Sequence, residues 1–310
     1  MQLEGIHHIS SITADAARNV DFYVRVLGLR MVKKTVNQDE PSVYHLFYAD
    51  EQGSPGADLT FFEYPGARRG RAGAGMIHRI VLRVGAEASL DFWRGRLADE
   101  GIESERDERS LRFADPEGLG LELIVDDSGD PPLTAHAPDV PAEHALRGIA
   151  GVRAYHPDPA RSASLLRDVL GFTSGDDTLR AWEARGETRG GFYAYDEPPA
   201  ERGFGGAGTV HHVAWAAHDP DIEAWDRRIR LAGGHTSGLV DRFWFRSVYF
   251  REPSGVLFEI ATLGPGFTAD EPLEQLGTSL VLPPRFEHLR AEIERVLTPL
   301  PNPRAAASPQ

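Results

Sequence analysis

The stretch "GIHHISSITADAARNVDFYVRVLGL", residues 5–29, returns in altered form as "GIAGVRAYHPDPARSASLLRDVLGF", residues 148–172. The two stretches align without a gap. Two further segments begin in the same way: "GMIHRIVLRVGAEASLDFWRGRL" from Gly75 and "GTVHHVAWAAHDPDIEAWDRRI" from Gly208. Self-similarity at such intervals indicates a fold built from repeated units. We therefore treat the chain as four related modules.

Each module has the same predicted order of elements. It starts with a run in which apolar residues alternate, which is typical of a half-buried strand. Asp158 and Asp219, each followed by proline, predict acid N-caps of the helices that come next. Gly28 and Gly171 fit the helix ends, and short β-rich runs close each module. The predicted βαβββ modules span about 4–65, 75–126, 147–196 and 208–262.

The domain organisation follows from these modules. At 310 residues the chain exceeds the roughly 100–200 residues of one typical domain. The segment "DDSGDPPLTAHAPDVPAEH" is rich in proline and aspartate, has no period, and marks the best boundary. The predicted fold class is α+β, with two tandem domains of two modules each, followed by one helix at 283–297 and a frayed tail. The predicted boundaries are 1–126 for the N-terminal domain, 127–146 for the linker, 147–264 for the C-terminal domain and 265–310 for the extension.

The composition excludes several classes of function. The chain has no cysteine, which removes disulfides, thiolate nucleophiles and cysteine-type zinc sites. A net charge of −14 argues against a nucleic-acid partner, which needs clustered lysine and arginine. No apolar run approaches the ~20 residues of a membrane span, and the N-terminus does not resemble an export signal. We expect a cytoplasmic protein. The sequence is compatible with a homo-oligomer but does not fix the oligomeric state.

Glycine-rich segments lead into the second and fourth modules. They read "RRGRAGAG" at 68–75 and "ERGFGGAG" at 201–208. Neither follows a strand and opens a helix, as a phosphate-binding loop would. We therefore expect flexible loops.

A comparison of the modules at two equivalent positions gives the candidate site. One position faces inward on the first strand of a module, and the other faces inward on its last strand. His8 occupies the first position in module one; His212 and Glu259 occupy both positions in module four. Gly151 in module three cannot ligate anything, and module two supplies Glu122. Modules one and four must therefore pair face to face if these three ligands are to meet.

Two imidazoles and one carboxylate on rigid strands form a facial triad that leaves coordination positions open. This donor set suits Fe(II), with Mn(II) as the alternative. Modules two and three would then form a second pocket around Glu122. Its other ligand would be His78 in one register, whereas Arg79 takes the position in the other, and the sequence leaves this choice open. Either way the second pocket lacks a full triad and is expected to be structural.

Longer motifs point to a family. They include "LGLRMVKKTVN" at 27–37, "HHVAWA" at 211–216 and "SVYFREPSGVLFEIAT" at 247–262. In these motifs the chain resembles the vicinal oxygen chelate superfamily, which contains glyoxalases, bleomycin-resistance proteins and extradiol dioxygenases. Within it, the chain is most similar to the hydroquinone-type ring-cleaving dioxygenases. The resemblance extends to about Pro272.

The resemblance implies an Fe(II)-dependent enzyme that uses O₂ to cleave the ring of a hydroquinone or related dihydroxybenzene. The iron would be held by His8, His212 and Glu259. The resemblance also implies proton transfer by His211 or Tyr249, and stabilisation of anionic oxygen or of a ring substituent by Arg242. The five further site residues implied are His7, Ser10, His211, Arg242 and Tyr249. Strict alternation would place His7 and His211 on the face opposite the ligands unless a bulge or a contact between strands intervenes.

Two other functions fit the same fold. A metal-dependent glyoxalase-like lyase or isomerase generally needs a further carboxylate from the strand "DLTFFEY", in which Glu63 appears out of register. A non-enzymatic protein that binds small molecules and confers resistance is the other alternative. The remaining candidate histidines are expected to be exposed: His45, His136, His144, His218, His235 and His288.

Overall fold

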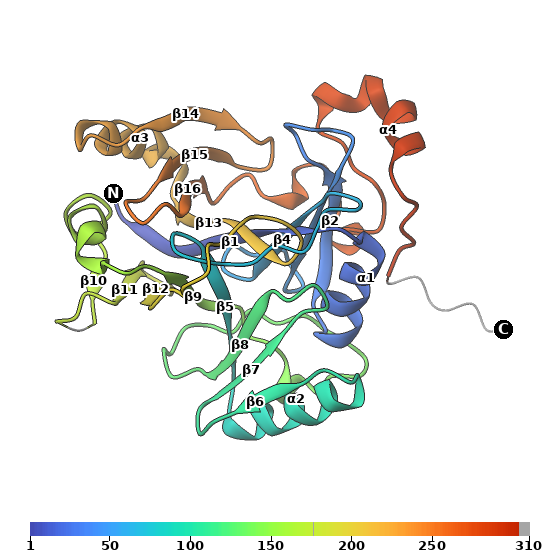
Figure 1. The fold of residues 1–310 in the computed structure, drawn as a ribbon. Coiled ribbons are helices and arrows are strands. Elements are labelled where there is room, and N and C mark those ends of the chain that lie inside the picture. The colour runs from blue at the N-terminus through green and yellow to red at the C-terminus, as the bar shows by residue number, and fades with distance from the viewer. Residues whose placement is uncertain (176, 304–310) are drawn as a thin grey trace.

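The computed structural model describes residues 1–175 and 177–303. It contains two eight-stranded sheets that lie against each other (Figure 1). The strand orders are β14-β15-β16-β13-β1-β4-β3-β2 and β10-β11-β12-β9-β5-β8-β7-β6. The predicted α+β fold of four βαβββ modules is confirmed, and one large hydrophobic core extends through both sheets.

The elements follow the module order. Module one contains β1 (Leu3–Thr13), α1 (Ala16–Val20), η1 (Asp21–Val26), β2 (Arg30–Val36), β3 (Tyr44–Ala49) and β4 (Asp58–Glu63). Module two contains β5 (Ile77–Val84), α2 (Glu87–Asp99), β6 (Ser104–Arg106), β7 (Ser110–Ala114) and β8 (Gly120–Val125). Module three, after the turn η2 (Ala142–His144), contains β9 (Ile149–Tyr155), η3 (Pro159–Ser162), η4 (Leu165–Val169), β10 (Thr173–Ser174), β11 (Ala181–Arg185) and β12 (Gly190–Asp196). Module four contains β13 (Thr209–Ala217), η5 (Asp219–Asp221), α3 (Ile222–Leu231), β14 (Thr236–Asp241), β15 (Arg246–Arg251) and β16 (Leu257–Thr262).

The modules pair across the chain. Strand β1 of module one runs antiparallel to β13 of module four, and β5 of module two runs antiparallel to β9 of module three. The predicted pairing of one with four and two with three is therefore confirmed. Both sheets thus combine strands from both halves of the chain, and we retain the division at 1–126, 127–146, 147–264 and 265–310 as a proposal.

A buried acid at the D/E-P-x-G turn ties the sheets together in each half of the chain. Asp115 in module two accepts a hydrogen bond from the Tyr23 hydroxyl of module one, at 3.2 Å. Glu252 in module four accepts one from the Tyr193 hydroxyl of module three, at 3.0 Å. Burial raises the pKa of both carboxyl groups, that of Asp115 to about 6. The repeated turn motif therefore joins consecutive modules that lie in different sheets.

Of the two predicted N-caps, Asp158 is the N-cap residue of η3, whereas Asp219 lies inside η5, whose N-cap is His218, so the second prediction is wrong. The Asp158 side chain makes no capping hydrogen bond, and the Asp219 carboxylate instead accepts the Gly264 backbone N–H at 3.1 Å. In both modules the chain enters the helix through a short 3-10 turn. By contrast, Asp15 in module one caps α1 by accepting the N–H of Arg18 at 3.0 Å.

The glycine-rich segments are ordered, contrary to the expectation of flexible loops. They pair with each other through isolated bridges, in which the N–H of Arg71 donates to the carbonyl of Phe204 at 3.0 Å. A Cβ at Gly73 would lie 2.3 Å from the Gly203 nitrogen, so only glycine permits this approach. The glycines of these two segments therefore allow their backbones to pack in direct contact.

The C-terminal extension packs on the first sheet near β2 (Figure 1). It comprises η6 (Phe267–Ala269), η7 (Leu273–Gln275), η8 (Pro284–Leu289) and α4 (Arg290–Val296). The helix predicted at 283–297 is thus a 3-10 turn followed by a short α-helix. The end of the predicted frayed tail, 304–310, lies outside the described residues.

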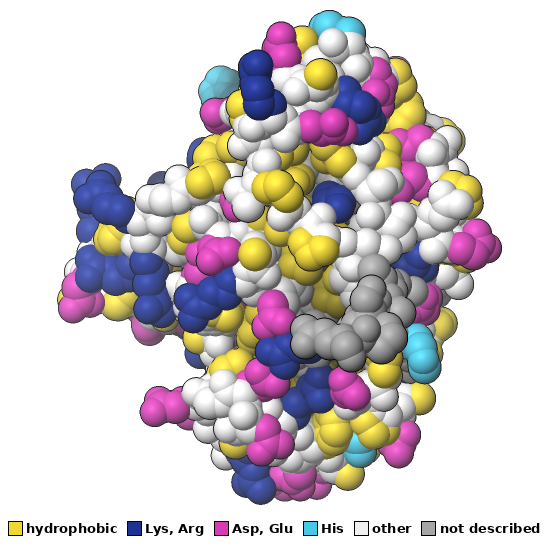
Figure 2. All heavy atoms as spheres, turned by 90° about the vertical axis from the view of Figure 1, so that its right-hand side faces the viewer, with side chains coloured by type: hydrophobic (Ala, Val, Ile, Leu, Met, Phe, Trp, Pro, Cys, Tyr) yellow, Lys and Arg dark blue, Asp and Glu magenta, His cyan; other side chains and the backbone are white. Residues whose placement is uncertain are grey.

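The surface and the helices add two observations. On the face shown in Figure 2, acidic and basic side chains are mixed with hydrophobic ones, and basic side chains gather at its left edge. That face does not present one continuous area of a single charge. Among the described residues, no helix has both the length and the apolar character needed to span a membrane.

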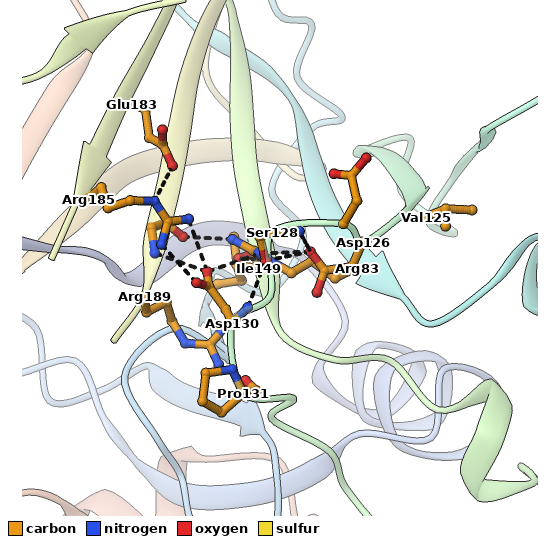
Figure 3. A network of polar contacts seen from close by, with 12 residues as sticks. Arg83, Val125, Asp126, Ser128, Asp130, Pro131, Ile149, Glu183, Arg185 and Arg189 are labelled. Carbon is orange, nitrogen blue, oxygen red and sulfur yellow. Dashed lines mark hydrogen bonds and ion pairs between the residues drawn. The ribbon is translucent and has the colours of Figure 1, made fainter. Parts of the chain in front are cut away.

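Arg83 fastens the connection between the second and third modules to the sheet. Its guanidinium lies 2.9 Å from the Asp126 carboxylate and 3.1 Å from that of Asp130 (Figure 3). It also donates to the carbonyl oxygens of Ile149 and Gly190, at 3.2 and 2.7 Å. Because Arg83 is buried, these partners replace the water that its charge has lost.

We predict that Arg83→Met lowers the free energy of unfolding by about 3 kcal/mol, because it removes a buried cation that pairs with Asp126 and Asp130 and donates to two backbone carbonyls. Urea and thermal unfolding followed by circular dichroism would measure the change. Arg109→Met is the matched control. Arg109 binds Asp127 in the same segment, but both side chains are exposed, so the loss should stay below about 1 kcal/mol. Equal losses in the two variants would contradict this account.

Candidate metal centre

Three buried side chains converge between β1, β13 and β16. The His8 Nε2 lies 3.2 Å from the His212 Nε2, and the Glu259 Oε2 lies 3.2 Å and 2.9 Å from these two nitrogens. Their facing atoms all lie within 4.8 Å of one another. The structure therefore brings together the three side chains that the comparison of modules selected. It is the one such group of histidine and acid side chains found among the described residues.

The atoms in this group fit a divalent cation. The Glu259 Oε1 accepts a hydrogen bond from the Ser247 hydroxyl, whereas the buried Oε2 has no hydrogen-bond partner. Burial would raise the pKa of Glu259, but the charges of His8 and His212 outweigh it and hold this pKa well below its usual range. Burial lowers the pKa of His212. An ionised oxygen and imidazole nitrogens that face one point are the donor set of a metal site.

Two β-bulges bring His7 and His211 beside the ligands. Ile6 pairs with Trp215 and His8 with Ala214, so His7 is the extra residue on β1. On β13, the shift between the pairs Ser10–His212 and Ser11–Val210 makes His211 the extra residue. The bulges resolve the conflict with strict alternation, because an extra residue re-aims its side chain.

The outer histidines orient the ring of each inner one. The Nδ1 atoms of His7 and His8 are 2.9 Å apart, and those of His211 and His212 are 2.7 Å apart. If His8 offers Nε2 to a metal, its Nδ1–H donates to His7, and the His7 Nε2–H donates to the Thr262 carbonyl at 3.1 Å. Burial, aided by His8, lowers the pKa of His7 to about 3. His7 therefore fixes a tautomer from behind the site, and it does not line the cavity.

A cavity of about 240 Å³ opens in front of the three side chains. This is slightly below the ~300–1,000 Å³ typical of ligand pockets, which indicates a small ligand. Phe47, Phe62, Trp244 and Phe245 give it aromatic walls. Its polar lining residues are His8, Ser10, Asn37, Gln38, Asp39, His45, Tyr64, His211, His212, Arg242 and Tyr249.

Ser10 and His45 share a hydrogen-bonded chain in the cavity wall. The Ser10 hydroxyl lies 2.6 Å from that of Thr60, which lies 2.9 Å from the His45 Nε2. The prediction that His45 is exposed is therefore wrong, because β3 turns it inward against β4. His144 is also half-buried, stacked on Phe92. The other four predicted surface histidines are exposed: His136, His218, His235 and His288.

Thr60 occupies the position in module one that Glu259 holds in module four. Thr60 pairs with Ser10, two residues beyond His8, and Glu259 pairs with Ala214, two residues beyond His212. The sequence comparison missed Thr60 because it searched this strand for acids. Glu63 lies elsewhere and accepts the N–H of Ala16 at 2.9 Å.

Arg242 and Tyr249 meet at the cavity wall near His212. The Arg242 Nε donates to the Tyr249 hydroxyl at 3.2 Å, and the rings of Tyr249 and His212 lie 5.7 Å apart between centroids. Burial and then Glu259 raise the pKa of Tyr249, so its hydroxyl keeps its proton at neutral pH. The other face of the Arg242 guanidinium binds Asp39 through two hydrogen bonds of 3.0 Å.

The segment 263–272 supports the wall of the cavity from outside. The Phe267 ring lies 5.1 Å from that of Phe47, and the Trp244 Nε1–H donates to Asp270 at 2.9 Å. Lys33, fully buried, binds Asp270 and Glu271. None of 263–272 is among the described residues that line the cavity. The segment therefore packs behind the cavity wall and holds Phe47 and Trp244 in place.

The second centre has an internal cation in place of a triad. Val81 pairs with Glu122, which puts Arg79 at the position of His212 and resolves the register that the sequence left open. The Glu122 Oε2 binds the Arg153 Nε at 2.8 Å. A Cβ on Gly151 would lie 2.4 Å from the Phe192 ring, which fills this space. The guanidinium of Arg153 therefore balances the negative charge of Glu122, so this centre needs no metal ion to do so.

Comparison with known proteins matches the same repeat. The family model described as the Glyoxalase/Bleomycin resistance protein/Dioxygenase superfamily matches residues 5–123 and 148–260. The chain belongs to this superfamily. Its predicted resemblance is thereby confirmed, and the match covers all four modules.

Several relatives cover the whole chain. The chain is 41% identical to MhqA of Bacillus subtilis, provisionally named a ring-cleaving dioxygenase, over 97% of this chain and 100% of MhqA. It is 33% identical to the chlorohydroquinone/hydroquinone 1,2-dioxygenase of Sphingobium indicum, over 96% of each. A crystal structure of a provisionally named dioxygenase from Bacillus subtilis has a TM-score of 0.89 at 37% identity, covering 96% of this chain and 97% of that one. Glyoxalase I from Zea mays, at 14% identity, a TM-score of 0.59 and coverage of 83% of this chain and 92% of that one, shares the fold.

We predict that Glu259→Gln reduces the bound divalent metal to below about a tenth per chain, because it removes the one anionic donor of the group. Metal analysis by mass spectrometry after dialysis would measure this, and circular dichroism would show that the variant is folded. Glu122→Gln, at the equivalent position of the second centre, is the matched control and should leave the metal content unchanged. Metal loss in both variants or in neither would contradict the assignment.

Proposed function

We propose that this protein is an Fe(II)-dependent dioxygenase that cleaves the ring of a hydroquinone or related dihydroxybenzene. The observation that carries the proposal is the buried group of two imidazoles and one carboxylate that faces an aromatic-walled cavity. Three protein donors leave coordination positions for a substrate and O₂. The names of the relatives support ring cleavage, and the size of the cavity supports a single-ring substrate.

The chemistry depends on the residues around the metal. His8, His212 and Glu259 would hold Fe(II), which supplies positions for the diphenol and O₂ and a path for electrons between them. Partial burial and then His212 lower the pKa of His211 to about 4, so its ring is neutral at neutral pH. With its Nδ1 accepting the Nδ1–H of His212, the Nε2–H of His211 can donate a hydrogen bond to a substrate oxygen at the cavity edge. Tyr249 keeps its proton and can donate it to an oxygen that gains charge. Arg242 holds the Tyr249 hydroxyl in place.

His7 and Ser10 position groups around the proposed metal centre. His7 would keep His8 in the tautomer that presents Nε2, and Ser10, through Thr60 and His45, gives the wall a fixed pattern of hydroxyl groups. A wall whose hydrogen bonds are already formed can orient a ring hydroxyl without reorganisation. These contacts support positioning roles for His7 and Ser10.

Thr60 weighs against a glyoxalase-like lyase or isomerase. Such a site would need its further carboxylate at the position equivalent to Glu259, which this chain fills with a threonine hydrogen-bonded to Ser10 and His45. Activity restored by Ni(II) or Co(II) without oxygen would favour this alternative. A non-enzymatic binding protein would keep its affinity for aromatic ligands after His212→Ala and chelation.

We predict that the protein, loaded with Fe(II) under anaerobic conditions, consumes O₂ when a hydroquinone is added and yields a ring-opened acid. An oxygen electrode and mass spectrometry of the product would measure this. The Glu259→Gln variant should show no uptake above background, whereas Glu122→Gln should behave like the native protein. The absence of uptake with a panel of hydroquinones and catechols would overturn the proposal.

We also predict that Tyr249→Phe lowers kcat by about 100-fold, in the range expected for loss of a proton donor. Because Tyr249 makes no hydrogen bond to a proposed metal ligand in the described structure, the metal content should stay near that of the native protein. Steady-state kinetics with metal analysis would separate the two effects. A proportional loss of metal and activity would show that Tyr249 supports the metal site.

A further inference from the structure

Among the described residues that line the cavity, Asp39 and Arg242 carry the formal charges. The other polar lining residues there are neutral amides, hydroxyl groups and histidines. Burial keeps the pKa of His45 well below its ordinary value, so this ring is neutral at neutral pH. The electrostatic character of this region therefore depends on one pair of residues.

The two charges neutralise each other in a fixed geometry. Both Asp39 oxygens accept from Arg242, each at 3.0 Å, and Arg242 is 15% exposed whereas Asp39 is 73% exposed. The Asn37 side chain accepts the Asp39 N–H at 2.9 Å, and the Gln38 side chain donates to the Arg242 carbonyl at 2.7 Å. The loop after β2 and the loop after β14 are thus held together, and the Asp39 carboxylate lines the cavity beside the guanidinium.

Neighbouring cations do not take the place of Arg242. Arg285 donates to the Gln38 side chain at 2.8 Å, and Arg251 donates to the Gly255 carbonyl at 2.7 Å. Neither lines the cavity within the part of the chain that the structure describes. An anionic group on a bound ring beside this pair would therefore meet a guanidinium whose charge Asp39 already neutralises, with no other Lys or Arg among the described lining residues.

We propose that Asp39 is a specificity-determining residue that excludes dihydroxybenzenes bearing an anionic substituent. This inference rests on the proposed function and defines its substrate class as rings whose other substituents are uncharged. At the metal centre, a divalent cation and the Glu259 carboxylate leave one positive charge, which a single deprotonated ring hydroxyl would balance. A second anion would have to displace Asp39 from Arg242, against like-charge repulsion.

Binding without turnover tests the inference. The protein loaded with Fe(II) is titrated anaerobically, by calorimetry, with 2,5-dihydroxyphenylacetate and with its primary amide, a neutral ligand of the same shape. In the native protein the acetate should bind at least about tenfold more weakly than the amide. In Asp39→Asn, which frees Arg242 without changing the shape of the side chain, this ratio should fall by about tenfold or more.

Glu40→Gln is the matched control, since it removes one exposed negative charge from the next residue of the same loop. It should leave the ratio as in the native protein. A native ratio near one, or an unchanged ratio in Asp39→Asn, would overturn the role of Asp39 while leaving ring cleavage intact. An equal fall of this affinity ratio in Glu40→Gln would show that the net charge of the loop, and not the Asp39 side chain itself, weakens binding of the acetate. Failure of both ligands to bind the native protein would overturn the proposed function together with this inference.

Discussion

The antiparallel pairing of β1 with β13 is the constraint on which the rest of the site depends. It brings Ser10 opposite His212 and sets His8 two pairs away, although His8 and His212 are 204 positions apart in the chain. The bulge at His7 lies on one strand and the bulge at His211 on the other, so they offset each other. Pairing is regular again from Ser11 onward, a further shift lies between Leu3 and Ile6, and the two histidine pairs come together without breaking the sheet.

The two equivalent centres differ in how the charge of their buried glutamate is balanced. Glu259 and Glu122 occupy equivalent positions, and both are buried. Arg153 compensates Glu122 from within the chain, and Phe192 fills the space beside it. Glu259 keeps one oxygen without a hydrogen-bond partner, facing two imidazole nitrogens. A buried carboxylate needs a counter-charge, and only the first centre leaves that charge to come from outside the protein.

Periodicity and the repeat predicted the modules, the pairing of one with four, and the three facing side chains. These predictions succeeded because a repeated module places equivalent residues at equivalent positions, so a comparison of sequences becomes a comparison of geometry. The errors have local causes. Asp219 has the composition of an N-cap, but it lies inside the 3-10 turn that precedes its helix, and its carboxylate accepts the N–H of Gly264. The glycine-rich segments were predicted to be flexible loops, but they pair with each other although they lie far apart in the sequence, and local composition does not reveal such pairing.

The sequence by itself determined the number of modules, the exclusion of cysteine chemistry and the three side chains of the proposed metal centre. These properties depend on periods and residue types, which are written along the chain. Only the tertiary structure decided the surroundings of the two centres: His45 turned inward, Thr60 at the position equivalent to Glu259, Arg79 of the second centre at the register of His212, and Asp39 on Arg242. Each of these depends on strand register or on contact between distant loops, and one residue of register reverses the face that a side chain occupies.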